Sequence, residues 1–89
     1  MRVANGVRAL VSSEGAVLRD MRRDSTFSLN PLGASVWKLL QQGRSVDQII
    51  DQICVDYKAP RETIEQDVRA FLETLESHKL VITERPTAV

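Results

Sequence analysis

Polar and apolar residues alternate along the first third of the chain, which predicts strands that bury one face each. Three such stretches can be separated, over residues 7–11, 16–21 and 25–30. Ser12-Ser13-Glu14-Gly15 joins the first two as a turn in which the glycine can take a positive φ. The polar residues 22–24 lead into the third stretch, so the pattern predicts an antiparallel meander of three strands.

From Pro31 onward the apolar positions recur every three to four residues, which is typical of amphipathic helices. Asn30 and Pro31 provide an N-cap and a first-turn proline for a helix over 31–42, which ends before Gly43. Ser45 caps a second predicted helix that ends near residue 57, and a third runs from after residue 60 to about 77 or 78. Residues 80–83 are predicted as a closing strand or an apolar tail on the sheet, and 84–89 as a frayed end.

Three strands followed by three helices predict an α+β fold, and the last two helices have helix-turn-helix spacing. We expect a winged helix-turn-helix, with a three-stranded antiparallel sheet followed by three helices. The 89 residues should form one domain over 1–89, structured from about 7 to 82. A chain of this length can fold alone but is too short to surround a deep active-site cavity, which favours a binding module over an enzyme.

The third predicted strand is the candidate binding site. Phe27 and Leu29 should face the core, while Thr26 and Ser28 face away from it. If no further strand covers its outer side, the main-chain N–H and C=O groups of this strand can pair with an incoming extended peptide. A peptide ligand is therefore the first expectation.

Charge supports a peptide rather than a nucleic acid as the ligand. Twelve Lys and Arg residues balance twelve Asp and Glu residues, so the chain lacks the positive excess expected of a protein that binds phosphate backbones. The balance is uneven, with a net charge of +3 over residues 1–43 and −4 over residues 44–84. This asymmetry favours a peptide that carries both signs of charge.

The sequence offers no constellation typical of catalysis, so we predict no catalytic residue, cofactor or metal. His78 stands where the third helix ends and complements the helix dipole, and Cys54 lies on the apolar stripe of the second helix as a structural thiol. The carboxylate pairs along the helices are interpreted as solvated faces. A single cysteine, the lack of a signal peptide and the lack of a membrane-spanning run predict a cytoplasmic protein that does not bind a membrane.

Three segments together resemble the PqqD-like proteins, which are recognition elements for ribosomally made, post-translationally modified peptides (RiPPs). These segments are residues 29–40, 43–50 and 67–75, and the resemblance extends over about residues 7 to 82. Its most specific parts are Leu29-Asn30 with Gly33-Ala34 and Trp37, and Asp67-Val68 with Phe71-Leu72.

This resemblance implies a winged-helix domain that performs no chemistry and holds the leader segment of a precursor peptide. The leader would pair with the third strand and lie in the groove between that strand and the third helix. A free-standing chain is most similar to the leader-binding proteins of lasso peptide biosynthesis. The resemblance then implies two enzyme partners, a leader peptidase (a transglutaminase-like cysteine protease) and an ATP-dependent cyclase.

Two alternatives remain open at this stage. Within the family, the chain could be the peptide chaperone that delivers its precursor to a radical enzyme in pyrroloquinoline quinone synthesis. Outside it, the architecture alone would also permit a winged-helix DNA-binding regulator. Against DNA binding, three acids (Glu62, Glu65 and Asp67) lie in the first turns of the would-be recognition helix and would repel phosphates.

Helical geometry, at about 100° per residue, gives the third helix two borders that could line the groove. One border carries Asp67, Phe71, Thr74 and His78, and the other carries Glu65, Leu72, Glu76 and Lys79. We predict the first, because Phe71 offers an apolar wall and its polar neighbours can hydrogen-bond a peptide. The predicted binding residues are Ser25, Thr26, Phe27, Ser28, Leu29, Asp67, Phe71, Thr74, Leu75 and His78. Three of these are equally compatible with the core: Phe27, Leu29 and Leu75.

Overall fold

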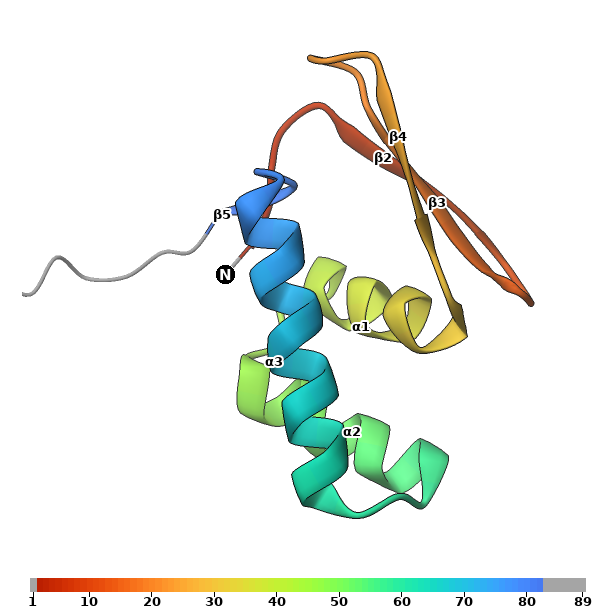
Figure 1. The fold of residues 1–89 in the computed structure, drawn as a ribbon, viewed down its shortest axis with the longest axis vertical. Coiled ribbons are helices and arrows are strands. Elements are labelled where there is room, and N and C mark those ends of the chain that lie inside the picture. Colours follow the sequence, from red (N-terminus) through yellow and green to blue (C-terminus); the bar gives the residue numbers. More distant parts are fainter. Residues whose placement is uncertain (1, 83–89) are drawn as a thin grey trace, which may run out of the picture.

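The computed structural model describes residues 2–82 and confirms the predicted meander (Figure 1). Strands β2 (Val7–Ser12), β3 (Gly15–Asp20) and β4 (Ser25–Leu29) form an antiparallel sheet in the order β2-β3-β4. Gly15, at the β2–β3 turn, has φ +144°, and a Cβ there would lie 2.1 Å from the Leu29 carbonyl oxygen. Only glycine allows the neighbouring strand to approach so closely.

Strand β4 has an open edge, because within residues 2–82 it pairs only with β3. At the far end of the β2–β3 ladder, Met21 N–H donates to the Gly6 carbonyl at 2.8 Å. Hydrogen-bonded pairs alternate along an antiparallel ladder, so the odd-numbered residues of β3, like Met21, direct their main chain toward β2. The even-numbered residues of β3 therefore direct their main chain toward β4. Their partners on β4 are Ser25, Phe27 and Leu29, whose main chain consequently points toward β3. The main-chain groups of Thr26 and Ser28 therefore point away from the sheet.

The three predicted helices are confirmed as α1 (Pro31–Gln41), α2 (Val46–Tyr57) and α3 (Arg61–Ser77). Asn30 accepts a hydrogen bond from Gly33 N–H at 2.7 Å, which fixes the start of α1 directly after β4. Ser45 and Gln48 form a reciprocal capping box at the start of α2. The observed order of elements agrees with the predicted α+β winged helix-turn-helix.

The hydrophobic core joins the inner face of the sheet to all three helices. Its largest fully buried side chains include Trp37, Leu18 and three isoleucines of α2. Leu29 (6% exposed) and Leu75 (0%) are also buried, so both belong to the core. Of the two interpretations left open for these leucines, the structure supports the core.

A second, two-stranded sheet was only partly anticipated. Strand β1 (Arg2–Val3) pairs antiparallel with β5 (Val81–Ile82), so the predicted closing strand exists but pairs outside the main sheet. Two residues give too short a pattern to identify β1 from alternation. Thr83 and the predicted frayed end at 84–89 lie outside the described residues.

Candidate functional site

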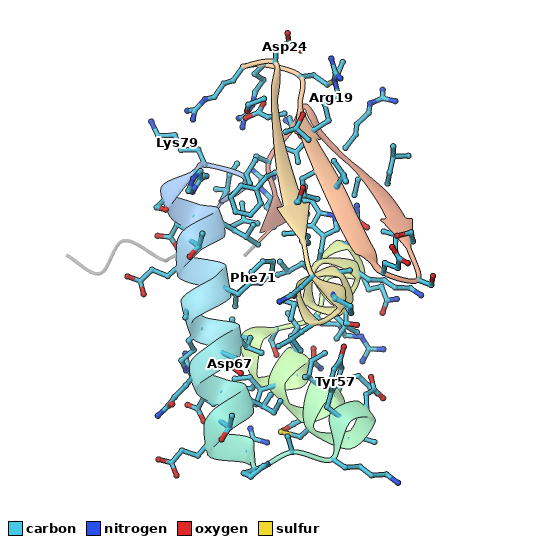
Figure 2. The ribbon with its side chains drawn as sticks, turned by 45° about the vertical axis from the view of Figure 1, so that its right-hand side comes forward. Arg19, Asp24, Tyr57, Asp67, Phe71 and Lys79 are labelled. Carbon is cyan, nitrogen blue, oxygen red and sulfur yellow. The ribbon has the colours of Figure 1, made fainter. Side chains whose placement is uncertain are left out.

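Helix α3 runs beside β4 (Figure 2), and two hollows lie on the side of α3 that faces β4 and α1. The upper hollow, of about 200 Å³, is lined by Leu18, Asp20, Arg23, Ser25, Thr26, Phe27, His78 and Leu80. The lower hollow, of about 330 Å³, is lined by Asn30, Leu32, Gly33, Val36, Asp67, Val68, Ala70 and Phe71. The lower hollow thus lies between α1 and α3, just beyond the end of β4. We call the two hollows together the β4–α3 groove.

In the upper hollow an aromatic contact bridges the strand and the helix. The rings of Phe27 and His78 meet edge to face, with centroids 5.1 Å apart and an interplanar angle of 68°. His78 Nδ1 lies 2.9 Å from the Thr74 carbonyl oxygen and, since a carbonyl only accepts, donates to it. The last turn of α3 thus orients the imidazole toward β4, in addition to the predicted role of His78 at the helix end.

In the lower hollow Phe71 reaches from α3 toward the first turn of α1 (Figure 2). A Cβ on Gly33 would lie 3.1 Å from Phe71 Cε1 and 3.2 Å from Asn30 Oδ1, tighter than ordinary contacts. Gly33 therefore allows the aromatic ring to pack against the start of α1. Phe71 remains half-buried, with part of its ring available as a wall of the groove.

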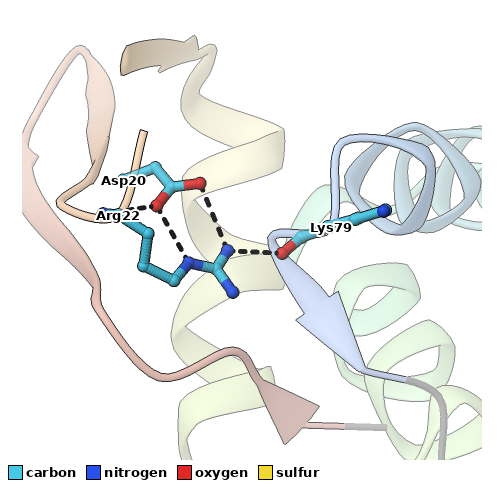
Figure 3. A network of polar contacts seen from close by, with 3 residues as sticks. All are labelled: Asp20, Arg22 and Lys79. Atoms are coloured by element: carbon cyan, nitrogen blue, oxygen red, sulfur yellow. Dashed lines mark hydrogen bonds and ion pairs between the residues drawn. The ribbon is translucent and has the colours of Figure 1, made fainter. Parts of the chain in front are cut away.

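An arginine clamp holds the two sides of the upper hollow together (Figure 3). Arg22 donates through Nε to Asp20 Oδ1 at 3.0 Å, and through Nη2 to Asp20 Oδ2 at 3.2 Å and to the Lys79 carbonyl at 2.8 Å. Asp20 is only 1% exposed, and its hydrogen bonds from Arg22 hold the pKa of the carboxyl below its ordinary value. The clamp ties the end of β3 to the turn after α3.

The structure brings six of the ten predicted binding residues to the groove. Ser25, Thr26, Phe27 and His78 line the upper hollow, and Asp67 and Phe71 line the lower one. Ser28 lies on the edge strand, and its main chain points outward although its side chain lines neither hollow.

Three predicted residues contribute differently. Leu29 and Leu75 are core residues. Thr74 lines neither hollow, and its Oγ1 donates to the Ala70 carbonyl at 3.0 Å. On the other border of α3, Glu65 pairs with Arg69 at 3.1 Å. Those two side chains line a separate surface with Arg61, Glu62 and Gln66. The predicted border of α3 therefore faces β4 at His78 and α1 at Asp67 and Phe71.

Sequence reasoning missed Arg23, Leu80 and the first turn of α1 as parts of the groove. The α1 residues could have been found, because a strand that ends directly in an Asn-Pro cap must place the first helical turn at the end of that strand. Arg23 lies in a turn with a positive φ at Asp24, and alternation carries no information about such a turn.

Within residues 2–82, no helix is long and apolar enough to cross a bilayer. Nor does this part of the chain contain a group of three His, Cys, Asp or Glu side chains that could hold a metal ion.

Comparison with known proteins gives three consistent results. Residues 15–81 match the family described as Coenzyme PQQ synthesis protein D (PqqD). The PqqA binding protein of Gluconobacter oxydans (strain 621H) is 33% identical over 60 residues, which are 67% of this chain and 62% of that relative's length. This chain thus spans less than two thirds of that relative.

Two solved structures share the fold. The first, TbiB1 in complex with the TbiA(beta) leader peptide, superposes with a TM-score of 0.88 at 29% identity, covering 97% of this chain and 100% of that one. The second, a lasso peptide synthetase B1 complexed with the leader peptide, gives 0.82 at 22% identity over 92% and 96% of the two chains. With the family match spanning most of the sequence, the chain belongs to the PqqD family.

Proposed function

We propose that this protein binds the leader segment of a ribosomally made precursor peptide and performs no chemistry itself. The observation that supports this function best is the open edge of β4 beside the two hollows of the β4–α3 groove. An extended peptide added to this edge would take hydrogen bonds from Thr26 and Ser28. Its alternate side chains would enter the hollows, so that the main chain provides affinity and the hollows provide specificity.

The related proteins support this reading. TbiB1 is described in complex with a leader peptide, and that structure matches this chain over nearly its whole length. By analogy, the protein works in lasso peptide biosynthesis in the cytoplasm. It presents its precursor to a leader peptidase of the transglutaminase-like cysteine protease type and to an ATP-dependent cyclase. Binding the leader would raise the effective concentration of the precursor at these enzymes.

The relative named PqqA binding protein favours a second candidate within the same mode of binding. In that case the chain is a peptide chaperone that delivers its precursor to a radical enzyme in pyrroloquinoline quinone synthesis. Neighbouring genes distinguish the two pathways. A precursor frame beside a peptidase and a cyclase supports the first, and one beside a radical enzyme supports the second.

Fluorescence polarisation tests the binding function directly. The purified protein is titrated against a labelled leader from the adjacent precursor gene and, separately, against labelled duplex DNA at physiological salt. We expect saturable binding of the leader and no binding of DNA. At the start of α3, Glu62 and Asp67 are exposed and Glu65 is half-buried, so their negative charges would repel the phosphates of DNA. Binding of DNA without binding of the leader would make the helix-turn-helix the functional element and overturn the proposal.

A further inference from the structure

The two hollows of the β4–α3 groove differ in charge. The upper one is lined by Arg23 and by Asp20, whose carboxylate Arg22 already binds, and the lower one by Asp67. We propose that the groove selects peptides with an acidic side chain in the upper hollow and a basic side chain in the lower hollow. This inference rests on the proposed function and adds to it the charge pattern of the ligand.

Arg23 gives the upper hollow its positive charge. In the turn between β3 and β4, Arg22 binds Asp20 and Arg19 Nη2 binds Asp24 Oδ1 at 2.9 Å, so both nearby carboxylates are engaged by other arginines. Arg23 lines the hollow and helps to lower the pKa of Asp20 through its charge, but it makes neither a hydrogen bond nor an ion pair within residues 2–82. An incoming carboxylate would therefore meet a guanidinium that no carboxylate of residues 2–82 holds in an ion pair, although Asp20 lies in its field.

Asp67 gives the lower hollow its negative charge. It is the only charged residue among those that line this hollow, and its carboxylate makes no ion pair or hydrogen bond with residues 2–82. The amide oxygen of Asn30, the other strongly polar group there, already accepts the Gly33 N–H. A lysine or arginine of the peptide would pair with Asp67 and lay its apolar stem along Phe71.

The partial charges at the ends of α1 and α3 are opposite in sign to the side-chain charges of Arg23 and Asp67, but they are smaller. The start of α1 carries a partial positive charge at the lower hollow, and the end of α3 a partial negative charge at the upper one. Asn30 caps the first, and His78 donates to a carbonyl of the second. Arg23 and Asp67 carry full charges, so they determine the sign that a peptide side chain meets in each hollow.

The length of β4 sets the spacing between the two charges of the ligand. Residues 25–27 line the upper hollow and Asn30 lines the lower one. Thr26, the middle residue of the first group, precedes Asn30 by four residues. An added strand rises by about the same 3.3 Å per residue as β4, so it would span the same interval in about four residues. Four is an even number, so both side chains would point to the same face of the added strand, toward the groove.

Selection from a displayed library of short random peptides tests this charge pattern without knowledge of the natural leader. The library is selected against immobilised wild-type protein, Arg23→Glu and Asp67→Lys, and the enriched peptides are sequenced. Arg8→Glu, on β2, and Glu73→Lys, about 120° around α3 from Asp67 and outside both hollows, are the matched controls. Circular dichroism confirms the fold of each variant.

We expect the wild type and both controls to enrich an acid and a base about four residues apart. Arg23→Glu should lose the acidic preference and keep the basic one, and Asp67→Lys should do the converse. A single enriched peptide should bind each groove variant about fivefold more weakly, as expected for partly exposed ion pairs.

Two results would overturn these claims at different levels. Enrichment of peptides without a paired charge, or a charge bias that Arg23→Glu and Asp67→Lys leave unchanged, would refute the charge pattern while the groove remains the binding site. If the wild type enriches nothing, or if Ser28→Pro enriches the same peptides as the wild type, strand addition at β4 is wrong, and the charge pattern fails with it.

Discussion

The sheet has two open edges within the described residues, and they differ in what lies beside them. On β4, the main chain of Thr26 and Ser28 points outward, and Thr26 lines the upper hollow of a groove that is shared with α1 and α3. On β2, Leu10 (79% exposed) and Val11 (56%) lie in the solvent. A hollow of about 180 Å³ that touches β2 extends across β3 to Ser28 and Leu29 of β4, and no helix residue lines it. Both edges can pair with a strand, but β4 also has helical walls that can distinguish its side chains.

Blocking one edge at a time gives the largest expected effect. Ser28→Pro removes an outward N–H and places a ring where the added strand would lie, but it spares the β3–β4 ladder. We expect leader affinity to fall by at least about 30-fold, because a main-chain bond is lost and a carbonyl of the peptide is left without a donor. Fluorescence polarisation with the labelled leader measures this loss.

Val11→Pro is the matched control on β2, because by the same alternation its N–H points outward from the sheet. It should leave leader affinity unchanged. Phe27→Pro is unsuitable as a test, since it would break the ladder with β3 and confound binding with folding. Equal losses in Ser28→Pro and Val11→Pro would mean that the leader does not distinguish the two edges.

The helical wall of the β4 groove gives the second effect. Phe71→Ala removes the aromatic side of the lower hollow, and we expect leader affinity to fall about tenfold because less apolar surface is buried in the complex. Glu65→Ala and Glu76→Ala change the other border of α3 and should bind the leader like the wild type. Isothermal titration calorimetry measures all three variants. If only the glutamate variants bind more weakly, the groove has been assigned to the wrong side of α3.

The difference between the two edges was only partly predictable from sequence. Alternation located all three main strands, and apolar spacing located all three helices, with Asn30 and Ser45 marking the starts of the first two. These signals are local, since each depends on residues a few positions apart. That β4 is an edge strand beside α3, by contrast, depends on contacts between residues far apart in the chain.

The same limit explains which residues that line the two hollows were predicted. Phe71 and Asp67 were identified because helical geometry places them on one border of the core stripe. In the sequence, Leu29 and Leu75 cannot be distinguished from apolar residues that line a pocket. Their burial becomes evident only from the packing of the fold. Arg23 has no periodic signal, and its place in the upper hollow depends on a turn whose conformation is set at Asp24 (φ 51°).

The arginine clamp provides the smallest effect on binding and a separate effect on stability. It holds β3 to the turn after α3 on the β4 side of the sheet. Asp20→Asn should weaken leader binding about threefold, since it loses a charge-assisted contact that keeps the upper hollow in shape. The melting temperature at pH 7, followed by circular dichroism, should fall by several degrees. Asp24→Asn is the matched control, because its pair with Arg19 is largely exposed and should contribute little.

The pH dependence of this destabilisation separates the ion pair from a simple packing defect. The ordinary pKa of the carboxyl is 3.8, and Arg22 lowers it in the folded protein. A carboxyl with a lowered folded pKa stabilises the fold above its unfolded pKa and loses that stabilisation as the pH falls through the folded value. The melting temperatures of the wild type and Asp20→Asn should therefore differ most near neutral pH and converge below about pH 4. A difference that stays constant down to low pH would show that Asp20 acts through shape rather than charge.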